Sequence, residues 1–252
     1  MKFFVISDIH SYYDEMKKAL DEAGFDENNE SHWIITCGDH FDRGDKPLEV
    51  MKYLHNLPRK ILIRGNHEDL FEDLCDRGFY YDYDISNGTM QTVCGLGNLR
   101  MFDDFSEACI TAEKREKNFF SQMVNYFETK NYIFVHSWIP LICNDNLPQY
   151  YMKNRKFSFN PNWRKASEEE WEQARWGNPF EFANKGLLPN KTVVFGHWHS
   201  SAGWAMSEGR SEFGKDAKFE PFFGDGFIAI DACTAHSGKC NVLVLEDDFL
   251  EE

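Results

Sequence analysis

The sequence predicts an α/β fold in which parallel strands carry helices on their outer faces. Five short apolar runs are spread along residues 3–195, the early ones alternate with helix-like segments, and each run is followed by Asp, Asn or His. Repeated strand–helix–strand units favour parallel pairing with helices packed outside. The carboxyl ends of such strands line up along one edge, where open α/β sheets bind ligands. The pattern therefore predicts one site built from distant parts of the chain.

The composition is that of an acidic protein with a substantial core. The 252 residues, 42% of them hydrophobic with 23 Phe, fit one large domain or a core with an insertion. The formal net charge of −15 disfavours nucleic acid and anionic membranes as partners. Seven scattered cysteines without a C-x-x-C pair favour free thiols in a reducing cytoplasm. The N-terminus has too few apolar residues for a signal peptide, and no run approaches membrane-spanning length.

The first strand–helix units are expected between residues 2 and 63. Expected strands cover 2–7, 33–37 and 60–63, and expected helices cover 12–23 and 47–57. Gly24 ends the first helix, while Pro47 starts the second and Pro58 stops it. Asp8 and His10 lie two residues apart, and on the extended backbone expected here both side chains would point the same way.

The rest of the chain alternates core strands with two less regular stretches. A helical insertion is expected over about 69–130, with helices at 69–77 and 117–129, and an irregular insertion over about 138–176, with a helix at 167–176. Core strands are expected at 132–135, 192–195, 227–230 and 242–245, the last two pairing across the Ser237-Gly238 turn. A glycine-rich segment is expected up to residue 226, and residues 246–252 are expected to form a solvated acidic tail.

Five motifs follow the five strand-like runs. In chain order they are Asp8-Ile9-His10, Gly38-Asp39-His40-Phe41-Asp42-Arg43-Gly44, Gly65-Asn66-His67-Glu68, His136, and Gly196-His197-Trp198-His199. Each motif alone could be a charged turn with no function. Together and in this order they resemble the calcineurin-like metallophosphoesterase superfamily. The Asp-Arg-Gly and His-Glu extensions resemble its serine/threonine phosphoprotein phosphatase branch, including small bacterial and phage members.

The resemblance implies a four-layer fold, with two packed mixed β-sheets flanked by helices, and a site for two metal ions. The implied ligands are Asp8, His10 and Asp39 for the first ion, and Asp39, Asn66, His136 and His197 for the second. Asp39 would bridge the ions, because a carboxylate has two oxygens with spare lone pairs. His199 matches a further ligand of the first ion in the wider superfamily, with a structural role as the alternative. The donor set suits manganese best, with iron or zinc as alternatives.

The same resemblance implies how a phosphate ester would be hydrolysed. A hydroxide shared by the ions would attack phosphorus in line, and the ions would make the site locally positive despite the acidic chain. His67 would protonate the leaving oxygen while Asp42 holds the imidazole. Arg43 and Asn66 would bind the phosphate, the former through its planar fork. Arg175 is the candidate for a second phosphate-binding arginine, and its alternative role is that of a cation at a helix C-terminus.

Two features set the chain apart from the phosphatase branch. Ser11 and Ser137 stand where that branch prefers glycine, and the second histidine of the Gly-His-x-His motif is rare there. The leading hypothesis is a phosphomonoesterase that acts on a phosphoprotein or a small phosphate ester. The alternative is a nucleotide or dinucleoside-polyphosphate hydrolase of the same superfamily. A metal-free binding scaffold is disfavoured, because such proteins lose ligands and this sequence keeps all of them.

Overall fold

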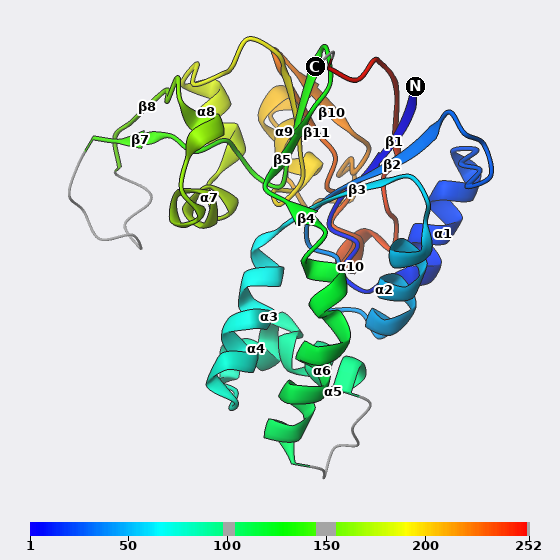
Figure 1. The fold of residues 1–252 in the computed structure, drawn as a ribbon. Coiled ribbons are helices and arrows are strands. Elements are labelled where there is room, and N and C mark those ends of the chain that lie inside the picture. The colour runs from blue at the N-terminus through cyan, green and yellow to red at the C-terminus, as the bar shows by residue number, and fades with distance from the viewer. Residues whose placement is uncertain (98–103, 145–154, 251–252) are drawn as a thin grey trace.

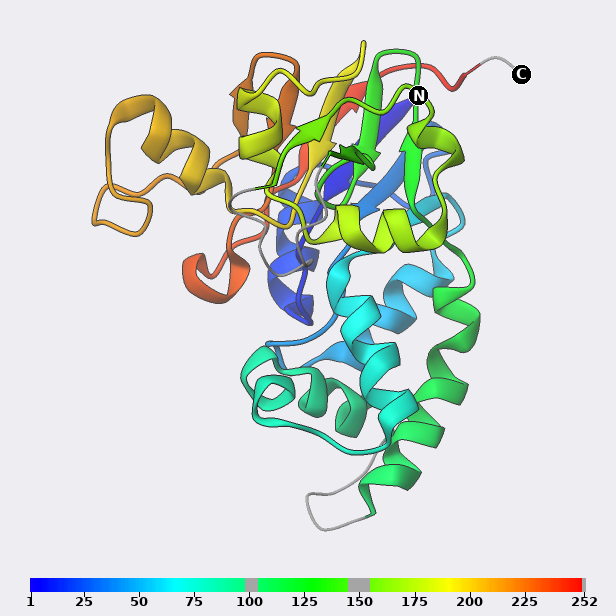
Figure 2. The ribbon, with the colours of Figure 1, turned by 90° about the vertical axis from the view of Figure 1, so that its left-hand side faces the viewer.

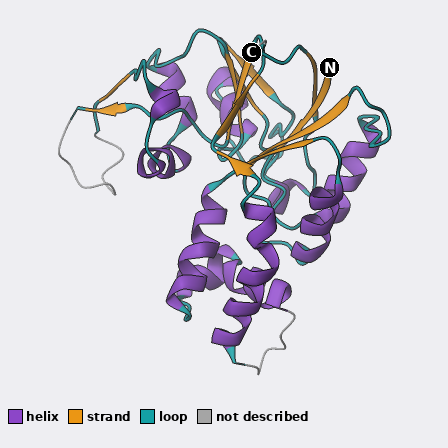
Figure 3. Cartoon of the chain, in the orientation of Figure 1, coloured by secondary structure: helices purple, strands orange, loops and turns teal. Residues whose placement is uncertain are grey.

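The computed structural model describes residues 1–97, 104–144 and 155–250, and its centre is a pair of β-sheets (Figures 1 and 3). The first sheet contains β1 (Lys2–Ile6), β2 (His32–Cys37), β3 (Lys60–Ile63), β4 (Met123–Val124) and β12 (Leu243–Glu246). Its order is β12-β1-β2-β3-β4. Strands β1 to β4 are parallel, and β12 pairs antiparallel with β1.

The second sheet has the same mixed character. Its strands are β5 (Tyr126–Glu128), β6 (Tyr132–Val135), β9 (Thr192–Phe195), β10 (Phe222–Gly224) and β11 (Phe227–Ala229), in the order β10-β11-β9-β6-β5. The three central strands are parallel, and the two edge strands are antiparallel to their neighbours. A separate antiparallel pair joins β7 (Ile142–Cys143) to β8 (Phe157–Ser158).

Helices cover the outer faces of both sheets. Those packed on the first sheet's side are α1 (Tyr13–Glu22), α2 (Pro47–Asn56), α3 (Asn66–Arg77), α4 (Asp82–Asn87), α5 (Thr89–Gly97) and α6 (Phe105–Phe120). The remaining helices are α7 (Glu168–Arg175), α8 (Pro179–Asn184), α9 (Ser200–Glu208), α10 (Thr234–Ser237) and the short 3-10 turn η2 (Trp163–Lys165). Helices α3 to α6 form a lobe at one end of the sheets (Figures 1 and 2). None of the described helices is long and apolar enough to cross a membrane.

The alternation of side chains along β1 shows how the layers are held together. Phe3 and Val5 lie in the apolar cluster between the sheets, together with Phe134 of β6. Phe4 and Ile6 point the other way, into the cluster shared with the helices. Successive side chains of a strand face opposite sides of its sheet, so β1 contributes to two cores. The predicted arrangement of two packed mixed sheets flanked by helices is confirmed.

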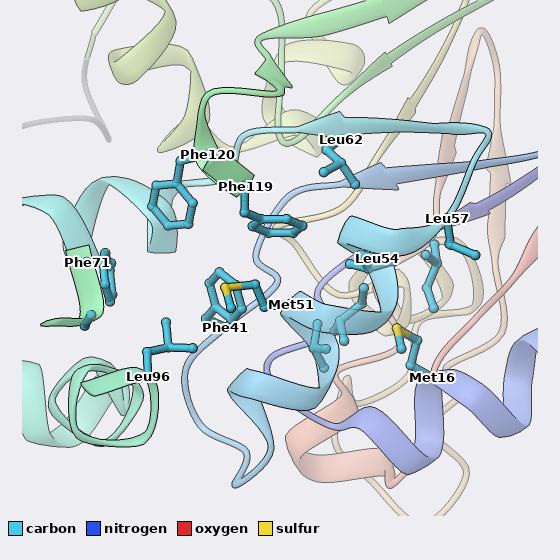
Figure 4. Packing of buried hydrophobic residues seen from close by; sticks show 14 of the residues in the cluster. Met16, Phe41, Met51, Leu54, Leu57, Leu62, Phe71, Leu96, Phe119 and Phe120 are labelled. Atoms are coloured by element: carbon cyan, nitrogen blue, oxygen red, sulfur yellow. The ribbon is translucent and has the colours of Figure 1, made fainter. Parts of the chain in front are cut away.

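The motif after β2 is anchored in the helix-side core by Phe41. Its side chain is fully buried, and Figure 4 shows it among Leu96, Phe119 and Phe120. The Phe41 ring centroid lies 5.7 Å from that of Phe119 and 6.0 Å from that of Phe120. The lobe of α5 and α6 therefore packs directly beneath the residues that precede Asp42.

Two of the predicted elements are wrong because sheet pairing overrides local preference. The helix expected at 117–129 ends at Phe120 with α6, and the following residues form β4 and β5, one in each sheet. The strands expected at 227–230 and 242–245 do not form a hairpin. The first pairs with β9 and β10, and the second pairs with β1 in the other sheet.

The glycine-rich segment contains helix α9 and strand β10. One expectation near the C-terminus is corrected. The acidic tail packs against the protein as far as Phe249, because the Asp247 carboxylate accepts hydrogen bonds from Thr129 and Asn131 and the Phe249 ring packs on Phe3. Residues 251–252 of that tail lie outside the described residues, as do 98–103 and 145–154 of the two expected insertions.

Candidate active site

The polar residues that follow the strands meet at one place between the two sheets. Asp8 and His10 follow β1, Asp39 follows β2, and Asn66 and His67 open α3 directly after β3. From the second sheet, His136 follows β6 and His197 follows β9. Two groups of these side chains could hold a metal ion: the first is formed by His10, Asp39 and His67, and the second by Asp39, His136 and His197. Asp8 faces the first group, and Asn66 faces the second.

The backbone of these motifs is held in an unusual conformation. In the described part of the chain, the residues with positive φ other than glycine are Asp8, His10, Ser11, Asp39, Asp42, Arg43, His197 and Cys233. All but Cys233 lie in the motifs or directly beside one. The extended backbone expected at Asp8 and His10 is therefore wrong, because the chain turns directly after β1. Conformations with positive φ are costly for residues with a Cβ, and they concentrate at functional sites that the surrounding structure supports. The close approach of the turns also requires Gly196, since a Cβ there would overlap the side chains of Ser7 and Asp8.

The second group of donor atoms draws on both sheets. The Asn66 Oδ1 atom lies 2.7 Å from His136 Nε2 and 2.9 Å from His197 Nδ1, and the two ring nitrogens are 3.2 Å apart. Asp39 Oδ1 lies 3.4 Å from His136 Nε2. Ligand atoms about 2.1 Å from an ion stand about 3.0–3.4 Å from one another in tetrahedral or octahedral shells. The two spacings of 3.2 and 3.4 Å lie in this range, while the two to Asn66 Oδ1 are shorter, so the four donors would have to spread slightly around a metal ion.

Hydrogen bonds outside the group fix which ring nitrogens can bind a metal. His136 donates from Nδ1 to the Cys37 carbonyl at 2.8 Å, which leaves its Nε2 lone pair facing the other donors. His10 donates from Nδ1 to the Phe41 carbonyl, also at 2.8 Å, and its Nε2 faces Asp8 and Asp39. Partners of this kind orient metal-binding imidazoles in many metalloproteins.

The first group is more open than the second. His10 Nε2 lies 3.9 Å from Asp8 Oδ1 and 3.7 Å from Asp39 Oδ2. His67 Nε2 also faces Asp39 Oδ2, at 3.8 Å, so the His67 ring lies in this group as well. Each carboxylate oxygen of Asp39 thus faces a different group, an arrangement that suits a bridging ligand. The predicted ligands Asp8, His10, Asp39, Asn66, His136 and His197 are all brought together.

Burial sets the protonation of the site. Burial, followed by the positive charge of Arg43, lowers the pKa of His10 well below its usual value. Burial likewise lowers the pKa of His197, so both rings are neutral and able to bind a metal. Burial and the neighbouring charges of Asp231 and Asp39 raise the pKa of Asp8. A cation bound among these carboxylates would relieve their mutual repulsion.

His67 and Asp42 form a buried pair. His67 Nδ1 donates to Asp42 Oδ2 at 2.7 Å, so Nε2 is the nitrogen that faces the site. Burial alone would lower the pKa of His67, but the charge of Asp39 and the hydrogen bond and charge of Asp42 outweigh it and raise that pKa to about 9. A protonated imidazole held by a carboxylate has the form required of a general acid.

The two arginines have different surroundings. Arg43 is exposed, and its guanidinium donates to His10 Nε2 at 2.8 Å and lies 3.3 Å from His67 Nε2. Arg175 is buried, and its guanidinium binds both oxygens of Asp69 at 2.7 and 3.1 Å, Glu168 at 3.0 Å and Asn125 at 2.7 Å. These contacts favour the structural role for Arg175, and phosphate binding by Arg175 stays a prediction.

His199 lies in neither group of donors. Its Nδ1 binds Glu212 Oε1 at 3.1 Å, and its Nε2 is 3.9 Å from Asp231 Oδ2. A role for His199 as a metal ligand stays a prediction.

The site also contains residues to which the sequence reasoning gave no role. Asp231 is buried beside Asp8, and burial raises its pKa to about 7. It follows the apolar run 227–230, so the signal that marked the other motifs could have found it. Glu68 accepts hydrogen bonds from the backbone N–H groups of Gly65, Asp39 and His40, and so joins the turns after β2 and β3.

Known proteins share this fold and parts of this sequence. A solved structure provisionally described as a diadenosine tetraphosphatase superposes with a TM-score of 0.51 over 100% of this chain and 95% of its own, at 14% identity. A cold-active protein tyrosine phosphatase superposes with a TM-score of 0.50 over 97% of this chain and 73% of its own, at 15% identity. At these identities the similarity concerns the fold alone.

Curated relatives match a shorter stretch. The symmetrical bis(5'-nucleosyl)-tetraphosphatase of Nitrosococcus oceani is 41% identical over 69 residues, which is 27% of this chain and 24% of the relative. The corresponding protein of Proteus mirabilis is 33% identical over a stretch of the same length. The chain thus spans about a quarter of the length of these relatives. The sequence pattern of calcineurin-like phosphoesterases, by contrast, matches residues 1–201, which include every predicted metal ligand. The chain therefore belongs to the calcineurin-like phosphoesterase family.

Proposed function

We propose that the protein is a metal-dependent hydrolase that cleaves dinucleoside polyphosphates. The reaction class follows from the family and from the two groups of donors that share Asp39. The partial similarity to symmetrical bis(5'-nucleosyl)-tetraphosphatases suggests the substrate. One structural observation supports this choice of substrate: two exposed indole rings flank the site.

Trp176 and Trp198 are those rings. They are 43% and 38% exposed, and their centroids lie 6.4 and 6.2 Å from the ring of His197. Trp176 also lines an apolar cavity of about 480 Å³ with Leu141 and Phe182. Nucleobases stack on such rings with a gain of about 1–3 kcal/mol per base. A substrate with a base at each end could therefore place its phosphates at the donor groups and its bases against these side chains.

The chain's own residues would bind and orient the phosphates. Two metal ions held by the donor groups would supply positive charge and an acidified water as the nucleophile. Manganese suits the oxygen and nitrogen donors, and we propose it as the first metal to test. Arg43, exposed beside His10 and His67, would bind non-bridging phosphate oxygens through its fork. The N–H of His67 Nε2 would give its proton to the oxygen that leaves phosphorus, while Asp42 keeps the other nitrogen protonated.

A second candidate substrate is a phosphomonoester such as phosphoserine. The observation that favours it is the His67–Asp42 pair, because an alkoxide is a poor leaving group and needs a proton. A nucleoside diphosphate leaves more readily and depends less on an acid. In either case a reducing cytoplasm is the proposed location, in keeping with the free thiols of Cys37, Cys75, Cys109 and Cys240.

A substrate panel with manganese separates the candidates. Diadenosine tetraphosphate, a phosphoserine peptide, p-nitrophenyl phosphate and a bis-phosphodiester would be compared at equal concentration. We expect kcat/KM to be highest for diadenosine tetraphosphate. Trp176→Ala and Trp198→Ala should each raise KM for that substrate by about tenfold, within the range of one lost stacking contact. Trp204→Ala is the control, because the Trp204 indole packs on Phe222. Efficient cleavage of the phosphopeptide with no cleavage of the dinucleotide would instead establish the second candidate.

A further inference from the structure

We infer that the corner between α4 and α5 positions the catalytic pair: Thr89 and Thr92 hold the Asp42 carboxylate in the orientation that His67 needs. This inference rests on the proposed hydrolase function for the role of the pair. The two threonines belong to the helical lobe, outside the motifs of the family. They would act through Asp42 and are therefore positioning residues.

The contacts account for both oxygens of the carboxylate. Thr89 Oγ1 donates to Asp42 Oδ2 at 2.7 Å, the oxygen that also accepts from His67 Nδ1 at 2.7 Å. Thr92 Oγ1 donates to Asp42 Oδ1, again at 2.7 Å. All four side chains are buried. Three donors around a buried carboxylate favour this orientation, because rotation would lengthen the short hydrogen bonds to its two oxygens.

Thr92 also holds the backbone of Asp42. The Asp42 N–H donates to Thr92 Oγ1 at 2.9 Å, so this hydroxyl accepts from the backbone and donates to the side chain of one residue. Asp42 and Arg43 have φ values of 73° and 61°. Hydrogen bonds from outside the turn are what such a left-handed backbone requires to persist.

Gly88 lets the corner approach this closely. Its φ of +87° suits glycine, and a Cβ at this position would overlap the backbone nitrogen of Arg43. From there α5 runs into the core that contains Phe41, to which it contributes Val93 and Leu96. The lobe thus contacts the Asp42-Arg43 turn through Gly88, Thr89 and Thr92, and packs beneath it through an apolar core.

Removing the Thr92 hydroxyl tests whether this residue positions Asp42. Thr92→Val keeps the shape of the side chain but leaves Asp42 Oδ1 and the Asp42 N–H without this partner, while Thr92→Ser restores it. For Thr92→Val we expect kcat on a phosphoserine peptide to fall about tenfold, less than the loss of about 10²–10⁴-fold expected without the acid. The kcat on p-nitrophenyl phosphate should change less than twofold, because nitrophenolate leaves without a proton. The KM values and the metal content should stay the same.

Two variants serve as controls. Thr92→Ser should behave as the wild type on both substrates. Ser86→Ala removes an exposed hydroxyl from α4, bonded to the Tyr83 carbonyl, and should change nothing. Equal loss on both leaving groups, no loss on either, or a Thr92→Ser variant as impaired as Thr92→Val would overturn the inference. If Thr92→Val does not fold, Thr89→Val is measured in the same way and judged by the same outcomes.

A readout without turnover separates this inference from the proposed function. If the wild type cleaves nothing on the panel, the proposed function fails, but the hydrogen bond between His67 and Asp42 can still be observed. The proton on His67 Nδ1 should give a low-field NMR signal in the wild type and in Thr92→Ser. In Thr92→Val that signal should move upfield or exchange faster. An identical signal in all three proteins would overturn the inference.

Discussion

Asp39 offers the sharpest test of the shared metal site. Its Oδ1 atom lies 3.4 Å from His136 Nε2, and its Oδ2 atom lies 3.7 Å from His10 Nε2. In Asp39→Ala both groups lose a donor, so we expect metal content to fall from two ions per chain to well below one.

Asp39→Asn should give an intermediate result whose direction follows from one hydrogen bond. The backbone N–H of His67 donates to Asp39 Oδ1 at 3.0 Å. An asparagine at this position would therefore turn its carbonyl oxygen toward that N–H and its NH2 toward His10. An amide nitrogen has no lone pair to offer a metal. The group containing Asp8 and His10 should therefore lose its ion first, which leaves about one ion per chain. Asp39→Ala should also destabilise the fold by about 1–3 kcal/mol, because the buried N–H loses its acceptor.

The assay is metal analysis after gel filtration, with thermal unfolding measured on the same samples. Asp45→Asn, an exposed aspartate three residues beyond Asp42, is the matched control and should keep both ions. A folded Asp39→Ala variant with two ions per chain would refute the bridging role. An Asp39→Asn variant that keeps the ion beside His10 and loses the other would refute the orientation argued above.

Three further predictions concern His67, Ser11 and Glu116. His67→Ala should keep its metal and lose about 10²–10⁴-fold in turnover on phosphoserine, with a smaller loss on p-nitrophenyl phosphate; loss of metal would identify His67 as a ligand instead. Ser11 has a φ of 61° and a buried hydroxyl with no hydrogen-bond partner among the described residues, so Ser11→Gly should raise the free energy of unfolding by about 1 kcal/mol. The control Ser137→Gly should lower it, because Ser137 Oγ donates to the Gly177 carbonyl at 2.9 Å. Burial, with the nearby charges of Glu72 and Glu113, raises the pKa of Glu116 to about 8. Between the lower pKa of the unfolded carboxyl and this value the folded state retains a proton that the unfolded state releases, so stability falls as pH rises through that window. Glu116→Gln should therefore match the wild type near pH 4 and exceed it by about 1–3 kcal/mol at pH 8 in urea unfolding, and an equal pH dependence of both proteins would contradict the buried acid.

The residues of the two donor groups were predictable because their signal is local. Each follows an apolar strand run, and the parallel strands place all these ends at one edge. Thr89 and Thr92 carry no such signal, since they lie 47 and 50 residues from Asp42 in the sequence and meet it only through the packing of α5. The pairs of β4 with β3 and of β12 with β1 were missed for the same reason, since those partners lie far away in the chain. The pair of β5 with β6 is local, and it was missed because residues 117–129 were expected to form one helix.

The second donor group joins the two sheets, and this has a thermodynamic consequence. Asp39 and Asn66 come from the first sheet, while His136 and His197 come from the second. An ion bound by all four would add a cross-link between two layers that are also held together by apolar side chains and by hydrogen bonds such as that from His136 to the Cys37 carbonyl. Its binding would favour the native state alone, so each tenfold rise in free metal above the dissociation constant would add about 1.4 kcal/mol to the unfolding free energy. The melting temperature would then report the metal supply, and a cell depleted of the ion would hold a protein whose halves separate more easily.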